Sequence, residues 1–168
     1  MAMQDHRRLL EGARSLADIF EVVKAVVSEN LHRSRAGLML GLADLGNHPQ
    51  GFLGAFYPVA SNMIVMNRVP LHRIKETSPR LWKPYAFHVL LHEYLHTLGY
   101  MSEDVVRPMV LEISKAALGP RHAATRIAAA PHRLIPNLAY PDAAWQPEEL
   151  RIELVEGFDR SSVASYIR

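Results

Sequence analysis

The sequence predicts an α+β domain in which helices accompany a small, mostly antiparallel sheet. Three observations indicate this class. Apolar residues recur at helical spacing over residues 15–32, three short apolar segments separated by turn residues occupy residues 35–69, and further helical patterns follow residue 83. With 168 residues and no internal repeat or linker, the chain is expected to form a single domain, residues 1–168.

Residues 1–82 are expected to form an N-terminal helix and the sheet. The helix is expected from Ser15 to His32, because the apolar residues between them share one face. Glycine, proline and polar residues then divide the chain into short apolar segments, which predict strands within residues 35–46, 51–60 and 61–69. Since the links between these strands are short, an antiparallel meander is expected.

Residues 83–130 are expected to be helical. The firmest helix runs from about Pro84 to Leu98, and Gly99 after it is a typical C-terminal stop. A second helix is expected from near Asp104 to Gly119, with a start or a kink near its internal proline. A short helix is expected within residues 121–130.

Residues 131–168 are expected to form a loop and a strand followed by a tail. Residues 131–147 are rich in proline, which predicts a surface loop, and residues 148–158 alternate apolar and polar side chains, which predicts a strand.

The composition narrows the classes of function. There is no cysteine, so a metal site in this chain has to use His, Asp or Glu. The formal net charge of +2 argues against a dedicated nucleic-acid partner. No apolar run approaches membrane-spanning length and the N-terminus has no apolar signal core, so no membrane association and a cytoplasmic location are expected.

The segment HVLLHEYLH, residues 88–96, carries the chemistry that the sequence predicts. On a helix, His92 and His96 lie one turn apart on one face, about 6 Å from each other, so both imidazoles can bind one Zn²⁺. Glu93 lies about 100° further round, where its carboxylate can reach a water molecule activated by the metal. His88 continues the stripe, but a straight helix holds it too far away to bind the same ion. Six residues of the same predicted helix form a separate arc that is expected to face the core: Phe87, Leu90, Leu91, Tyr94, Leu95 and Leu98.

The HEYLH motif resembles that of the zincin metallopeptidases. The order of an N-terminal helix, a small sheet and the motif helix also resembles a minimal zincin fold, of the kind expected for small uncharacterised zincin-like proteins of archaea and bacteria. Metzincins place a third histidine where this chain has Ser102, whereas gluzincins take a glutamate from the following helix. The resemblance therefore implies that Glu93 is the catalytic base and that His92 and His96 bind zinc.

The third ligand stays open between two residues. Glu103 is close in sequence to the turn that follows the motif helix, and His122 follows a Gly–Pro break that could fold the chain back. Glu112 is expected to lie too far along its helix. Three tyrosines, Tyr57, Tyr85 and Tyr100, are candidate donors to an oxyanion.

The function predicted from these features is a zinc-dependent peptidase acting on a peptide or protein substrate. Zincins hold an extended peptide against an edge strand above the motif helix, and the segment at residues 51–67 is expected to supply that edge. One alternative is a catalytically silent zincin fold, or a latent one in which the tail at residues 157–168 occupies the cleft. A second alternative is a metal-dependent endoribonuclease, which the chain resembles in LHTLGY, residues 95–100, although Glu93 and the modest charge argue against it.

Overall fold

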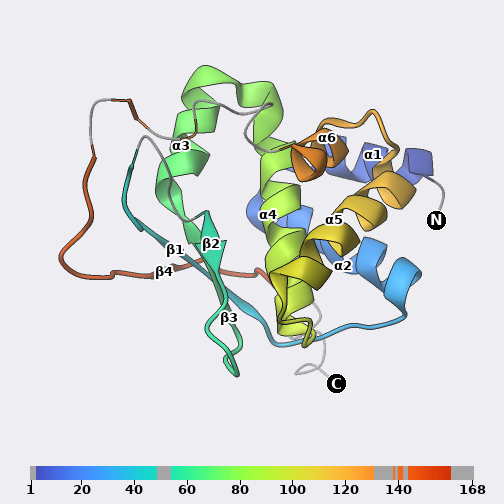
Figure 1. Ribbon diagram of the computed structural model, residues 1–168, viewed down its shortest axis with the longest axis horizontal. Helices are drawn as coiled ribbons and strands as arrows, with labels where there is room; N and C mark the ends of the chain where they lie inside the picture. Colours follow the sequence, from blue (N-terminus) through green and yellow to red (C-terminus); the bar gives the residue numbers. More distant parts are fainter. Residues whose placement is uncertain (1–2, 49–53, 131–137, 139, 142–143, 160–168) are drawn as a thin grey trace.

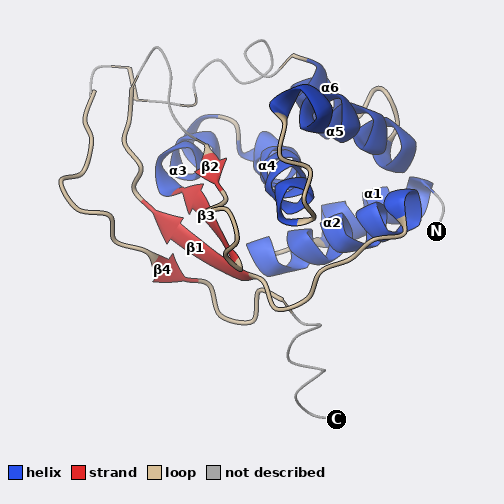
Figure 2. Ribbon diagram, turned by 60° about the horizontal axis from the view of Figure 1, so that its bottom comes forward, coloured by secondary structure: helices blue, strands red, loops and turns tan. Residues whose placement is uncertain are grey.

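The computed structural model describes residues 3–48, 54–130, 138, 140–141 and 144–159. The described chain forms a four-stranded sheet with helices gathered on one side of it (Figures 1 and 2). The strands are β1 (Met39–Ala43), β2 (Ala55–Phe56), β3 (Met63–Asn67) and β4 (Glu153–Leu154), in the spatial order β2-β3-β1-β4. The α+β class is therefore confirmed.

The predicted meander is wrong, because β1 and β3 pair in parallel. Met39 lies opposite Met63 and Ala43 lies opposite Asn67, whereas β2–β3 and β1–β4 pair antiparallel. A parallel pair needs a crossover between its strands. The chain between Asp44 and Asn62 supplies it and places β2 on the outer edge of β3.

The helices mostly follow the apolar periodicity. Helix α2 (Leu16–Leu31) begins after Ser15, whose hydroxyl accepts a hydrogen bond from the Asp18 amide at 3.1 Å, and ends at His32, in agreement with the prediction. Helices α4, α5 and α6 also lie where they were expected, at Trp82–Thr97, Glu103–Leu118 and Ala123–Ala129. Helix α5 runs through Pro108 and starts one residue before the expected position.

Two helices were not predicted. Helix α1 (Met3–Gly12) is polar on average, but it buries Leu10 against the body of the protein. Helix α3 (Arg68–Thr77) replaces the end of the strand predicted to Val69 and the irregular segment expected after it. The side chain of Asn67 caps α3 by accepting from the Val69 amide at 3.1 Å, and a short 3-10 turn, η1 (Pro79–Leu81), leads into α4.

Helix α4 lies at the centre of the helical layer and contacts α2, α3, α5, α6 and β2 (Figures 1 and 2). Its predicted apolar arc is buried as expected: Phe87, Leu90, Leu91, Tyr94 and Leu95 are fully buried and Leu98 nearly so. The opposite stripe of α4, which carries the histidines, is only half-buried. Packing of the apolar arc in the core therefore determines that the histidine face of α4 stays accessible.

The C-terminal segment returns to the core beside α2. The predicted strand at residues 148–158 is reduced to the two residues of β4, and the loop predicted over 131–147 falls largely outside the described residues. Phe158 stacks on Phe20 with ring centroids 4.1 Å apart, and the buried carboxylate of Asp159 accepts a hydrogen bond from Lys24 at 2.9 Å. The start of the tail at 157–168 thus packs on α2, and residues 160–168 lie outside the described residues.

Candidate metal centre

The two motif histidines converge with one acidic side chain of the next helix. The Nε2 atoms of His92 and His96 lie 3.1 Å apart. The carboxylate of Glu103, the first residue of α5, lies 3.0 Å from His92 Nε2 and 2.7 Å from His96 Nε2. Among the described residues, His92, His96 and Glu103 form the group of possible metal ligands whose nitrogen and oxygen atoms all lie within 4.8 Å of one another.

The turn between α4 and α5 brings Glu103 to the pair. It is short, and Gly99 adopts φ +102°, a left-handed conformation that glycine takes without steric cost. The Gly99 amide donates to the His96 carbonyl, and the Tyr100 amide donates to the Leu95 carbonyl. The chain therefore reverses within a few residues, so that the first residue of α5 faces the last turn of α4.

The backbone carbonyl of Tyr100 determines which nitrogen of His96 carries the proton. His96 Nδ1 lies 2.8 Å from this oxygen. A carbonyl oxygen only accepts hydrogen bonds, so Nδ1 has to be protonated. The Nε2 atom of neutral His96 is then left with a free lone pair, the form that binds a metal ion.

This assignment leaves one contact unsatisfied when His96 is neutral and Glu103 is ionised. The lone pair at His96 Nε2 faces the Glu103 carboxylate, which only accepts when ionised, at 2.7 Å. Two acceptors at that distance repel each other unless a proton or a cation lies between them. A proton at Nε2 would satisfy one edge of the triangle formed by His92, His96 and Glu103, whereas a cation bound to all three ligand atoms would satisfy every edge.

The donor set and its dimensions fit zinc. Two imidazole nitrogens and one carboxylate are a donor set typical of Zn²⁺ sites that keep one position open, whereas Mg²⁺ and Ca²⁺ prefer oxygen ligands alone. In a tetrahedral site with bonds of 2.0–2.1 Å, two ligand atoms lie about 3.3 Å apart. The separations in the cluster, 2.7–3.1 Å, are slightly shorter.

Electrostatics favour the protonation states that bind metal. Burial lowers the pKa of His92, so this imidazole stays neutral near pH 7. Partial burial alone would raise the pKa of Glu103, but its hydrogen bonds to His92 and His96 and their charge outweigh that effect, and the net direction is downward. Glu103 is therefore ionised near neutral pH.

Glu93 lies beside the cluster in a buried position. Its side chain is 8% exposed, and burial raises the pKa of its carboxyl to about 7. The charges of His96 and Glu103 also act on it, in opposite directions, so the carboxyl is within electrostatic reach of both residues. Glu93 is therefore a buried carboxyl that follows His92 directly on the motif helix.

His88 continues the histidine stripe towards the start of α4. It is half-buried, and burial together with the charge of His92 lowers its pKa to about 4. Its ring centroid is 6.5 Å from that of His92, and its buried Nδ1 atom has no hydrogen-bond partner among the described residues. His88 therefore lies next to the cluster as a neutral imidazole and outside the triangle of ligand atoms.

The three candidate tyrosines are placed differently from one another. The hydroxyl of Tyr57 accepts a hydrogen bond from Arg35 at 3.0 Å and donates to the Ser61 carbonyl at 2.9 Å. The hydroxyl of Tyr85 lies close to Gly54, next to the edge strand β2, which contacts α4 as the predicted edge requires. Tyr100 contributes its backbone carbonyl to His96. A role for any of the three hydroxyls at an oxyanion stays a prediction.

His122, the other candidate for the third ligand, lies at the opposite end of α4. It is the N-cap of α6, where its Nδ1 accepts from the Ala124 amide at 3.1 Å, and it shares a pocket with Trp82 and Pro84 at the start of α4. That start is about 12 Å or more from His92 along the helix. His122 therefore does not join the pair.

Replacing His122 with alanine is expected to leave zinc binding unchanged and to lower the free energy of unfolding by about 1 kcal/mol. The cause is loss of the hydrogen bond that caps α6. Chemical denaturation measures the stability change, and competition with a chromogenic chelator measures zinc affinity. Loss of stoichiometric zinc in this variant would return His122 to the ligand set and contradict the assignment to Glu103.

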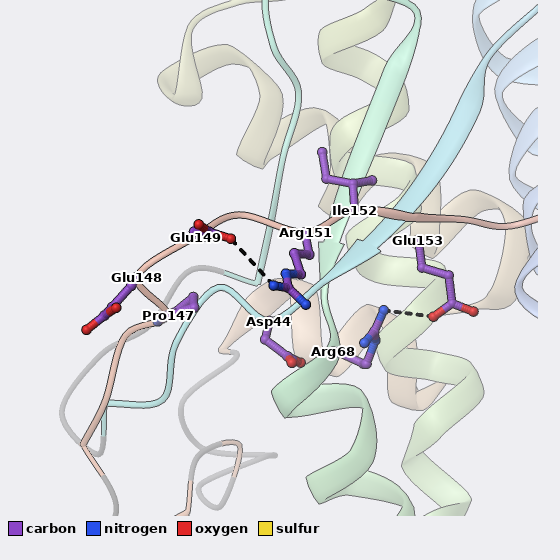
Figure 3. Close-up of a pocket in the computed structure, with 8 residues that line it drawn as sticks. All are labelled: Asp44, Arg68, Pro147, Glu148, Glu149, Arg151, Ile152 and Glu153. Atoms are coloured by element: carbon purple, nitrogen blue, oxygen red, sulfur yellow. Dashed lines mark hydrogen bonds and ion pairs between the residues drawn. The ribbon is translucent and has the colours of Figure 1, made fainter.

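A pocket elsewhere in the described residues lacks such chemistry. It has a volume of about 780 Å³ and is lined by charged residues around β4 and the start of α3 (Figure 3). Arg68 pairs with Glu153 at 2.9 Å and Arg151 pairs with Glu149 at 3.5 Å, so these charges are already matched. No histidine is among its described lining residues. The chemistry of the donor atoms, rather than the size of a cavity, therefore identifies the candidate site.

Comparisons with known proteins identify no relative: a scan against family models, a search of curated proteins and a search of solved structures each found no match. The described residues include no helix that is both long and apolar enough to cross a bilayer. The geometry of the cluster is therefore the basis for a proposed function.

The sequence interpretation missed one part of the site, the contact between the Tyr100 carbonyl and His96. A backbone carbonyl carries no signature in the sequence. Only the glycine three residues after His96, which is needed for the tight turn, indicated where the chain reverses.

Proposed function

We propose that this protein is a zinc-dependent hydrolase of peptide bonds. His92, His96 and Glu103 hold the metal, and Glu93 is the general base. The observation that carries the proposal is the convergence of three metal-ligand atoms from two helices, and the buried carboxyl of the residue that follows His92 supports it. A zinc ion held there supplies Lewis acidity, which activates water and polarises a carbonyl group.

The residues of the chain have separate tasks in this proposal. His96 is held in its metal-binding tautomer by the Tyr100 carbonyl. Glu103 neutralises one positive charge of the ion and closes the third corner of the site. Glu93 is attached to the same helical turn as His92, takes a proton from the attacking water and returns it to the leaving amine.

Two features support a peptide as the substrate. The edge strand β2 lies at the end of the sheet order and contacts α4, so its outer side can pair with an extended chain. His92 and His96 are half-buried rather than enclosed, which suits a polymer better than a small molecule. The reaction class therefore follows from the cluster and the substrate class from the edge strand.

The experiment begins with protein stripped of metal by a chelator and reloaded with zinc. We expect one zinc ion per chain, cleavage of casein by the loaded protein, and loss of that cleavage when 1,10-phenanthroline is added. Elemental analysis measures the metal, and release of acid-soluble peptides measures the activity. A protein that binds no zinc would overturn the metal site, whereas stoichiometric zinc without cleavage of any peptide in a random library would favour a silent binding protein.

A further inference from the structure

We propose that Arg33 and Arg35 are positioning residues for the metal centre. They lie in the segment between α2 and β1 and hold the turn that carries both the Tyr100 carbonyl and Glu103. This inference rests on the proposed metal site and adds to it the part of the chain that keeps its ligands in place.

The turn after α4 needs external partners. The last carbonyl groups of a helix receive no hydrogen bond from an amide of the same helix, and the helix dipole makes this end negative. Arg33 Nη2 donates to the Leu98 carbonyl at 2.6 Å, and Arg35 Nη1 donates to the Thr97 carbonyl at 2.9 Å. Two guanidinium groups therefore satisfy consecutive carbonyls at the end of the motif helix.

Arg33 also contacts Tyr100 directly. Its guanidinium lies over the Tyr100 ring, with the Cζ atom 5.1 Å from the ring centroid. Leu98 and Tyr100 flank Gly99, the flexible point of the turn. Arg33 thus connects the residues on both sides of that glycine, and one of them supplies the carbonyl that orients His96.

Arg35 connects the same end of α4 to the sheet. Its Nη2 atom donates to the Ser61 carbonyl at 2.7 Å, and its Nη1 atom contacts the Tyr57 hydroxyl at 3.0 Å. Its backbone amide donates to the Tyr94 hydroxyl at 3.0 Å. The Arg35 side chain therefore bonds to both the end of α4 and the β2–β3 connection, and it fixes their relative position.

This arrangement links the Arg33 side chain to metal affinity through two steps. Without Arg33, the Leu98 carbonyl and the Tyr100 ring lose a shared partner, and the turn gains freedom around Gly99. The Tyr100 carbonyl then holds His96 less firmly, and Glu103, three residues further, is presented less accurately. Removing an outer partner of a metal ligand typically weakens metal binding by about 10–100-fold.

The chain contains a matched control for Arg33. Arg7 Nε donates to the Leu118 carbonyl at 2.5 Å, which is the same kind of contact at the C-terminal end of α5. That end is 15 residues away from Glu103 along the helix, about 22 Å. An Arg7→Ala variant therefore loses an arginine bound to a helix end without touching the turn that carries the ligands.

The test compares zinc affinity of the parent, Arg33→Ala and Arg7→Ala by competition with a chromogenic chelator. We expect Arg33→Ala to bind zinc about tenfold more weakly, Arg7→Ala to bind as the parent does, and Arg33→Lys to recover part of the affinity. Equal affinity of parent and Arg33→Ala would overturn the proposal, and so would an equal loss in both alanine variants, since that would reflect general destabilisation.

The zinc affinity of the parent distinguishes failure of the proposed function from failure of this inference. A parent protein that binds no zinc would overturn the proposed function together with this inference, whereas a parent that binds zinc with an unaffected Arg33→Ala variant overturns this inference alone. Arg33 is largely exposed, so its alanine variant is expected to fold. If it does not, Arg33→Gln replaces it in the comparison with Arg33→Lys, and a glutamine variant that binds as tightly as the parent would contradict the proposal.

Discussion

Glu93→Gln protein is expected to keep one zinc ion per chain and to cleave peptides about 10²–10⁴-fold more slowly than the parent. Glutamine has nearly the same size as glutamate, so it fills the same buried position without a cavity. Its amide has no lone pair basic enough to take a proton from water. The variant therefore removes the base while leaving the ligands His92, His96 and Glu103 in place.

The measurement combines zinc content with the rate of cleavage of casein or a quenched fluorescent peptide. Glu112→Gln is the matched control, because Glu112 is an exposed glutamate of α5 that pairs only with Lys115 among the contacts described for it. It should retain the parent rate. If Glu93→Gln cleaved as fast as the parent while holding zinc, Glu93 would not be the base.

The second large effect is expected from the ligands. His96→Ala and Glu103→Gln should each weaken zinc binding by more than about 100-fold, beyond the loss typical of outer partners. Each change removes one of the three atoms that converge within 4.8 Å, and two remaining ligands bind zinc poorly. The Glu103 change is the sharper one, because it separates this residue from His122 as the third ligand.

Zinc affinity of these variants is measured by chelator competition, with circular dichroism as the check on folding. His72→Ala is the control, since His72 is an exposed histidine of α3. It should bind zinc as the parent does. Stoichiometric, tight zinc in Glu103→Gln protein would show that the cluster observed here is an ion pair between histidines and a carboxylate and that the third ligand lies elsewhere.

Much of the helical layer was predictable because its signals are local. The apolar periodicity located α2 and α4 to within two residues, and glycine marked the ends of α4 and α5. Helix α3 was missed although two cues were present, Asn67 as an N-cap and Pro70 in the first helical turn. The β-branched and apolar residues of β3 directly before α3 predict a strand more strongly than these two cues predict a helix.

The sheet was less predictable because strand pairing is a long-range property. The segments around β1, β2 and β3 were recognised, but their sequences do not indicate that β1 pairs in parallel with β3 while β2, which lies between them along the chain, pairs on the outer edge of β3. That order depends on how residues far apart in the chain bury their apolar faces against α2 and α4.

The sequence by itself determined the identity of the two histidines and the glutamate of the motif, and the helix that presents them, because spacing on one helix follows directly from residue number. Only the tertiary structure shows that Glu103 lies against His92 and His96, since this contact depends on where the chain reverses after α4. The same holds for the Tyr100 carbonyl and the two arginines, whose roles arise from contacts between segments distant in sequence.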